Sequence, residues 1–160
     1  MTIASATSST ILLGTAWTGT APGAASTPSG TINSGSGTYM DVSSWCSAVE
    51  VPLTIATNDA TTFGSAGFMV KTVGLKDGAL TLTLLNDFVN DGLDEKLYTM
   101  WGQTVYYDVK PTSSARGTGN PSYVGAVLVT DIKPMAVTVG GLVVMQLTWP
   151  TTGYFDRLVA

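Results

Sequence analysis

The sequence contains no histidine and only one cysteine, Cys46. Without imidazole, the chain lacks the most common general base and the Ser–His and Cys–His nucleophile pairs. One thiol without imidazole also cannot complete the usual zinc and copper sites. Cys46 cannot form an intrachain disulfide, and we expect it to be a small buried apolar residue rather than a reactive thiol.

Charged residues are also scarce. They make up 11% of the 160 residues, whereas about 25% is usual for a soluble domain. A monomer needs a charged surface to stay dispersed, so the shortage suggests that other molecules cover much of this surface. The net charge is −4, and the seven lysines and arginines are scattered. This pattern argues against tight binding to nucleic acid, which requires clustered cations.

Long hydrophobic runs are missing as well. Hydrophobic residues reach 44%, but no apolar run approaches the roughly 20 residues of a membrane helix. The first residues, Met1–Ser5, have neither a basic region nor an apolar core, so no secretory signal is expected. Together with the single cysteine, this favours synthesis in the cytosol.

What the sequence does contain is alternation of apolar and polar residues. This alternation predicts a mainly β fold, an antiparallel sandwich or barrel with one flanking α-helix. We divide the chain into an N-terminal arm with a Gly/Ser/Thr-rich loop (1–40), a β-sandwich domain (41–150) and a C-terminal arm (151–160). The loop spans residues 14–40. Strands are expected at Thr10–Leu13, Val42–Ile55 with an edge or bulge at Pro52, Phe68–Val73, Ala79–Leu85, Thr104–Val109, Tyr123–Ile132, Met135–Val139 and Leu142–Trp149.

Two further local features stand out. Lys76-Asp77-Gly78 predicts a tight turn between strands. One helix is expected after Asp91, whose side chain can cap it, and Gly102 is placed to end it. Its apolar stripe would consist of Leu93, Leu97, Met100 and Trp101.

Three other kinds of chemistry were weighed against plainer structural roles. Asp87, Asp91 and Asp94 could form a weak calcium site, but a turn and a helix start explain them more simply. Carboxylates for glycoside hydrolysis would have to come from Glu50, Asp108 and Asp131, which nothing in the sequence brings together. Sugar stacking could use the four tryptophans, although Trp101 and Trp149 fit core positions.

A polar segment, Thr57–Ser65, follows an alternating strand and contains Thr61-Thr62-Phe63-Gly64. With other motifs in the same order, it resembles the tail tube (major tail) proteins of long-tailed bacteriophages, particularly those of actinobacteria. The resemblance covers about residues 40–155. The other motifs are Asp41–Trp45, Val49–Pro52, Gly74–Gly78, Asn86–Phe88, the Leu-Asp helix at Leu93–Leu97, the Arg116–Pro121 loop with Tyr123 and Gly125, and Thr148–Pro150 with Gly153.

The resemblance implies a structural virion protein and not an enzyme, with no cofactor. Hexameric rings would stack into the hollow tail tube, which encloses the tape measure protein and conducts DNA at infection. Tail terminator and tail-tip proteins would be further partners. The protein would be located in the virion tail, after assembly in the host cytoplasm. Contacts between copies are expected at Asn58, Asp59, Thr61, Thr62, Phe63 and Gly64, in the long loop Ala56–Gly67.

The net negative charge suits a duct that DNA must pass without sticking. Candidate acidic residues facing the lumen are Asp87, Asp108 and Asp131. The alternatives are a carbohydrate-binding β-sandwich module, a His-free hydrolase, or a related ring protein such as a tail terminator or a secretion-system tube protein. Motif Thr61–Gly64 favours the phage tube among the ring proteins.

Overall fold

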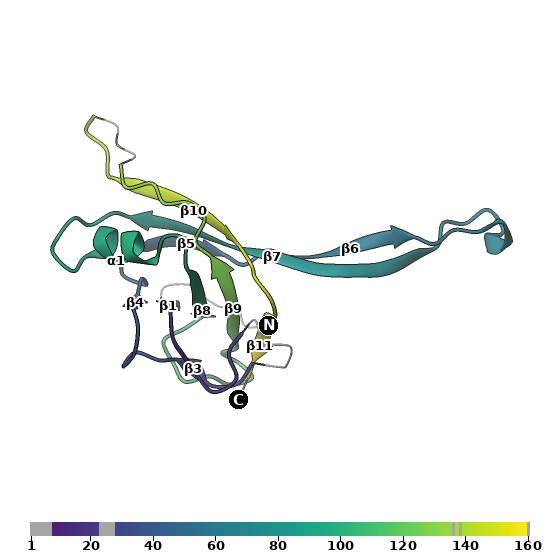
Figure 1. Cartoon of the computed structure of the whole chain (residues 1–160), viewed down its shortest axis with the longest axis horizontal. Coiled ribbons are helices and arrows are strands. Elements are labelled where there is room, and N and C mark those ends of the chain that lie inside the picture. The colour runs from purple at the N-terminus through teal and green to yellow at the C-terminus, as the bar shows by residue number, and fades with distance from the viewer. Residues whose placement is uncertain (1–7, 23–27, 136, 138, 160) are drawn as a thin grey trace.

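The computed structural model describes residues 8–22, 28–135, 137 and 139–159. Two antiparallel sheets pack face to face, one helix lies at one end, and a long two-stranded hairpin projects from the opposite side (Figure 1). The predicted class, a mainly β sandwich with one flanking helix, is therefore confirmed.

The first sheet has five strands in the order β11-β9-β8-β1-β4, all antiparallel. The predicted strands near residues 10, 104 and 123 are confirmed here, and the N-terminal strand lies inside the sheet between two partners. A separate two-stranded ribbon joins β2 (Trp17–Thr18) to β3 (Thr31–Ile32). The strands of the first sheet are β1 (Thr10–Gly14), β4 (Tyr39–Asp41), β8 (Thr104–Lys110), β9 (Ser122–Leu128) and β11 (Asp156–Leu158).

The second sheet has the order β10-β7-β5, and β6 pairs with the outer half of β7. Its strands are β5 (Cys46–Glu50), β6 (Leu53–Asp59), β7 (Lys71–Leu85) and β10 (Val144–Pro150). The single long strand predicted over Val42–Ile55 is divided at Pro52, where we expected an edge or bulge. Because proline has no N–H to donate to a ladder, the pairing is interrupted there, and β5 and β6 pair with successive parts of the same strand, β7.

The core lies between the two sheets and under the helix. The inward residues of β7 and β10 alternate strictly with outward ones, as expected for a half-buried sheet. Trp149 is fully buried, and its Nε1 donates a hydrogen bond of 2.8 Å to the carbonyl of Asp131. The largest fully buried side chains also include Leu13, Leu80, Leu82, Leu84, Leu93, Leu97, Met100, Tyr107, Met145 and Leu147.

Helix α1 (Leu93–Met100) buries Leu93, Leu97 and Met100 as predicted. Its beginning differs from the prediction, because Gly92 is the N-cap residue and Asp91 has a left-handed φ of 61°. The Asp91 carboxylate pairs instead with Lys96 at 3.3 Å. The helix ends at Trp101, followed by Gly102 with φ 78°, so the predicted stop is confirmed.

Trp101 does not belong to the buried stripe, contrary to the prediction. Its side chain is 53% exposed, and its ring lies beside that of Tyr98. The residue has left the helical conformation (ψ 129°), so the helical spacing that places position 101 over Leu97 no longer applies to it.

The predicted turn at Lys76-Asp77-Gly78 is also wrong, because β7 runs straight through it. Asp77 pairs with Thr54 and Gly78 with Leu53. A Cβ atom at Gly78 would lie 3.0 Å from the Pro52 carbonyl oxygen, so glycine serves close backbone approach there rather than a positive φ. The chain reverses instead near Ala66 (φ 50°) and Gly67 (φ 83°).

Two predictions near the C-terminus also need correction. The segment after Trp149 was expected to be an exposed arm, but Asp156–Leu158 pairs with Ser122–Val124 as β11. The sheet edge there offers unpaired backbone groups that an extended segment can bond. Of the predicted strand Met135–Val139, residues 136 and 138 lie outside the described part, and Met135, Val137 and Val139 are exposed and not in a strand.

Candidate functional site

The feature that sets this molecule apart is the projecting hairpin formed by β6 and the outer half of β7, here called the hairpin arm (Leu53–Gly78) (Figure 1). All seven residues of β6 are exposed. A register shift between Ile55 and Thr57 places Gly74 against Ala56, where a Cβ atom would lie 3.0 Å from the Ala56 carbonyl oxygen. The arm is therefore a regular ribbon with one bulge, held by its own ladder.

The predicted contact residues all lie in the outer part of the hairpin arm, and all are exposed. Asn58 and Asp59 are the last residues of β6, while Phe63 and Gly64 belong to the 3₁₀ turn η1 (Phe63–Ser65). Thr61 and Thr62 connect the two elements. The predicted polar loop begins at Ala60 rather than at Thr57, because β6 continues through Asp59.

Hydrogen bonds within the tip give it a defined shape. The Thr61 hydroxyl accepts from the Val70 N–H at 3.0 Å, and the Ser65 hydroxyl accepts from the Thr62 N–H at 3.1 Å. Asp59 accepts from the Thr61 N–H at 2.8 Å. Hydrogen bonds from Thr61 lower the pKa of the Asp59 carboxyl, because they favour its charged form. Polar residues of the tip therefore order the turn itself.

The tip also carries four exposed large apolar side chains, here called the tip cluster: Phe63, Phe68, Met69 and Val70. Sequence reasoning assigned the last three to a strand. One sequence feature indicates that these residues are not part of a half-buried strand: three apolar residues follow one another directly after Gly67, without alternation. Monomers seldom expose such clusters unless they bind something.

One face of the hairpin arm continues the core-facing side of β7. Residues two apart share a face, so Gly78 and Lys76 lie on the side of the buried Leu80. Their cross-strand partners, Leu53 and Ile55, lie on the same side and are about half exposed. This face of the arm therefore carries two exposed apolar side chains, Leu53 and Ile55, beside Lys76.

Helix α1 and the segments beside it form the opposite end of the molecule (Figure 1). These segments also carry exposed apolar residues. The Asp94 N–H donates to the Asp87 carbonyl, and the Asn86 N–H donates to the Val143 carbonyl at 2.8 Å. These bonds hold segment 86–89, the helix and the start of β10 together. We call the exposed apolar residues of this region the end patch: Phe88, Val89, Tyr98, Trp101 and Leu142.

The three candidate lumen-facing acids differ in their surroundings. Asp87 and Asp131 are partly exposed, and Asp131 lies 4.0 Å from Lys133. Asp108 is only 3% exposed, accepts a hydrogen bond from Ser122, and pairs with Arg116 at 3.3 Å. A buried and paired carboxylate adds nothing to the charge of an exposed surface. Asp87 and Asp131 remain as candidates.

The residues weighed for other chemistry are not assembled into a site. Glu50 lies on β5 in the second sheet, whereas Asp108 lies on β8 in the first and is occupied by Arg116. Asp91 pairs with Lys96 rather than with Asp87 or Asp94. Among the described residues, no group of three or more His, Cys, Asp or Glu side chains is arranged to hold a metal ion.

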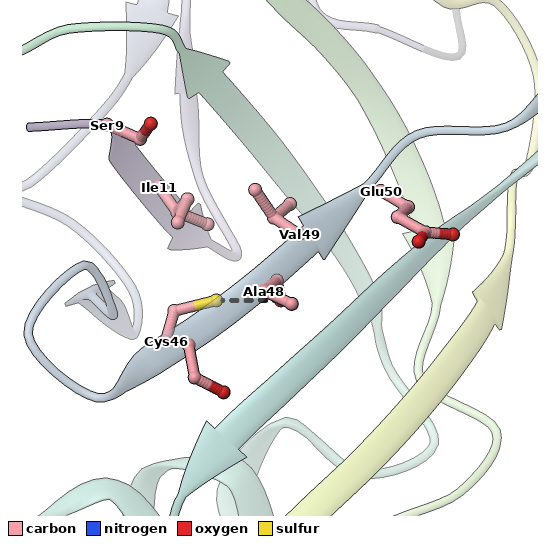
Figure 2. Close-up of a pocket in the computed structure, with 7 residues that line it drawn as sticks. Ser9, Ile11, Cys46, Ala48, Val49 and Glu50 are labelled. Atoms are coloured by element: carbon pink, nitrogen blue, oxygen red, sulfur yellow. Dashed lines mark hydrogen bonds between the residues drawn. The ribbon is translucent and has the colours of Figure 1, made fainter. Parts of the chain in front are cut away.

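A hollow of about 260 Å³ lies between the start of β1 and β5 (Figure 2). Its lining includes Cys46, whose thiol donates to the Ala48 carbonyl at 3.1 Å, and Glu50 at the other end of the strand. Cys46 is half-buried, and burial raises the pKa of its thiol. A thiol kept protonated is a poor nucleophile, so this hollow lacks the converging groups of a catalytic centre.

Comparison with protein-family models and with curated proteins gives no match for this chain. Within the described ranges, no helix has the length and apolar character needed to cross a membrane.

Proposed function

We propose that this protein is the tail tube protein of a long-tailed bacteriophage. Its copies form hexameric rings that stack into a hollow tube, which surrounds the tape measure protein and conducts DNA. The observation that carries the proposal is the hairpin arm, a ribbon of this chain that leaves the sandwich with exposed apolar side chains along its length and at its tip. The motifs around Thr61–Gly64 connect that arm to the phage family.

The energetics favour association of such a molecule. Full burial of one large apolar side chain contributes about 1.5–3 kcal/mol. The tip cluster alone has four such side chains, so a contact that covers it can offset the cost of bringing two copies together. The low share of charged residues, 11%, agrees with a surface shared among copies.

Electron microscopy of the concentrated protein tests the proposal. We expect rings or tubes with a central channel. A matched variant, in which residues Asn58–Ser65 are replaced by a short Gly-containing turn, should stay folded but lose the tubes, because the removed residues lie outside the core. A wild-type protein that stays monomeric at every concentration would contradict the proposal, and normal tubes from the shortened variant would contradict the role of the tip.

A carbohydrate-binding module is a second candidate, favoured by one observation. Tyr98 and Trp101 are both more than half exposed, with ring centroids 6.1 Å apart. Their planes are tilted by 50°, however, so the two rings do not form one continuous flat surface for a sugar to stack on. Quenching of tryptophan fluorescence by a soluble glycan, lost in Trp101→Ala and without polymer formation, would favour this candidate over the tube.

A further inference from the structure

We propose that the tip cluster of one copy docks on the end patch of a second copy, so that the chains associate head to tail. This inference rests on the proposed function and specifies its contact. The two surfaces lie at opposite ends of the elongated molecule, the tip cluster at the end of the hairpin arm and the end patch around α1 (Figure 1). Neither can cover the other within one chain.

The two surfaces match in chemical character. The tip cluster has two phenylalanines and a methionine, and the end patch has a phenylalanine, a tyrosine and a tryptophan. Aromatic residues and methionine are enriched at the centres of protein interfaces, because they bury a large area and adapt their shape. Thr61 and Ser65 accept hydrogen bonds from the backbone N–H groups of Val70 and Thr62, so burial of the tip cluster would leave these two donors paired.

Charge argues against the end patch pairing with another end patch. Residues 86–101 contain four carboxylates, Asp87, Asp91, Asp94 and Glu95, and one lysine, Lys96. Two such regions placed together would repel. The hairpin arm contains two lysines, Lys71 and Lys76, and two aspartates, Asp59 and Asp77, so its net charge is zero. It is the better match for an acidic end.

The arrangement has a consequence for assembly. A contact between two different surfaces of the same chain is heterologous, and it propagates unless a rotation closes it. An assembly of any length then keeps one free tip cluster at one end and one free end patch at the other, so growth continues at both ends. A tip-to-tip contact would instead be symmetric and would stop at a pair.

A mixing experiment distinguishes these contacts. The tip variant is Phe63→Ser with Phe68→Ser, and the end variant is Phe88→Ser with Trp101→Ser. All four side chains are exposed in the monomer, so both variants should fold. The control variant is Tyr154→Ser, an exposed aromatic outside both surfaces. Mass is measured by light scattering after size exclusion, and particles are viewed by electron microscopy.

We expect each variant alone to lose tubes, while the control keeps them. When the two variants are mixed, one intact contact remains between them, from the tip cluster of the end variant to the end patch of the tip variant. The mixture should therefore form a particle with twofold the mass of the separate variants, and nothing larger. Tubes from the end variant alone would overturn the inference and point to another partner for the tip.

The outcomes also separate this inference from the tube proposal. Tubes that persist in the end variant leave the proposed function intact and overturn the head-to-tail contact. The wild type could instead form linear filaments without a channel that require both the tip cluster and the end patch. That result would support the head-to-tail contact and overturn the tube proposal. If the mixture never exceeds the mass of the separate variants, the head-to-tail contact is overturned. Tip-to-tip association predicts this result.

Discussion

Gly125 on β9 lies directly opposite Tyr107 on β8, and the tyrosine ring fills the space that a side chain at 125 would need. A Cβ atom there would lie 2.5 Å from the Tyr107 hydroxyl oxygen and 2.6 Å from ring atom Cε1. Tyr107 is 1% exposed, so its ring has no free space to enter. The glycine is therefore explained by cross-strand packing rather than by backbone conformation.

Gly125→Ala should destabilise the fold by about 1–3 kcal/mol, because the added methyl overpacks a rigid core. Urea unfolding is the measurement, with a lower midpoint and an unchanged slope expected. Gly119→Ala is the matched control: nothing lies within 4 Å of its Cβ position, so its stability should stay within about 0.5 kcal/mol of wild type. Equal midpoints for the two variants would contradict the packing explanation.

Tyr107 also predicts a loss of stability in alkali. Burial raises its pKa from 10.0 to about 12, because the phenolate would lose its hydration. Below about pH 10 both states keep the proton. Between about pH 10 and 12 only the unfolded state releases it, so stability falls by up to about 2–3 kcal/mol. Urea unfolding across this range should show a steeper loss for wild type than for Tyr107→Phe, and parallel curves would contradict the assignment.

At the scale of elements, alternation predicted the strands that have one face in the core. The half of β7 over Ala79–Leu85 and strand β10 follow from local pattern, because their burial alternates with every residue. The outer half of β7 could not be predicted in this way. Its ladder with β6 depends on pairing across the chain, and local sequence at Lys76-Asp77-Gly78 favours a turn.

The candidate site was predicted in part for the same reason. Thr61-Thr62-Phe63-Gly64 marked the segment, and the structure places it at an exposed tip. The apolar residues Phe68, Met69 and Val70 beside it were assigned to a strand, whereas the structure leaves them exposed before β7 begins. Apolar character alone predicts burial, and only the three-dimensional arrangement reveals that these positions lie beyond the core.

The loop between β8 and β9 contributes Arg116 to an ion pair whose carboxylate, on Asp108, is buried. Arg116 reaches Asp108 at 3.3 Å and also donates from both terminal nitrogens to the Gly30 carbonyl at 3.2 Å. Arg116→Met leaves Asp108 buried without its partner, so we expect a loss of about 3 kcal/mol in urea unfolding. Adding Asp108→Asn to Arg116→Met should recover part of this loss, because the unpaired charge is removed.

Lys96→Met is the control for that prediction. Lys96 and Asp91 lie at the same distance, 3.3 Å, but the Asp91 side chain is 78% exposed. Solvent screens such a pair, and its loss should cost about 0–1 kcal/mol. If Arg116→Met and Lys96→Met were equally stable, burial would not be what gives the Arg116 pair its strength.

At the scale of the whole molecule, one chain buries the apolar side chains of its core but not those at its two ends. The inner residues of both sheets are fully buried, but the tip cluster and the end patch are left to solvent in the monomer. If copies associate as we propose, the folded form gains stability from its neighbours. Its thermal unfolding should consequently depend on protein concentration, as for any species whose folded form alone associates.

Each tenfold rise in concentration changes the free energy of association by about 1.4 kcal/mol per copy. For a domain of about 150 residues this corresponds to roughly 3–6 °C in the melting midpoint. Scanning calorimetry over a hundredfold range of wild-type concentration should show this rise, and the variant lacking Asn58–Ser65 should melt at one temperature throughout. Because the deletion removes only the exposed end of β6 and the tip and leaves the buried core intact, that temperature should match the wild-type value at the lowest concentration. A wild-type melting midpoint that does not change with concentration would show that the folded chain gains no stability from association.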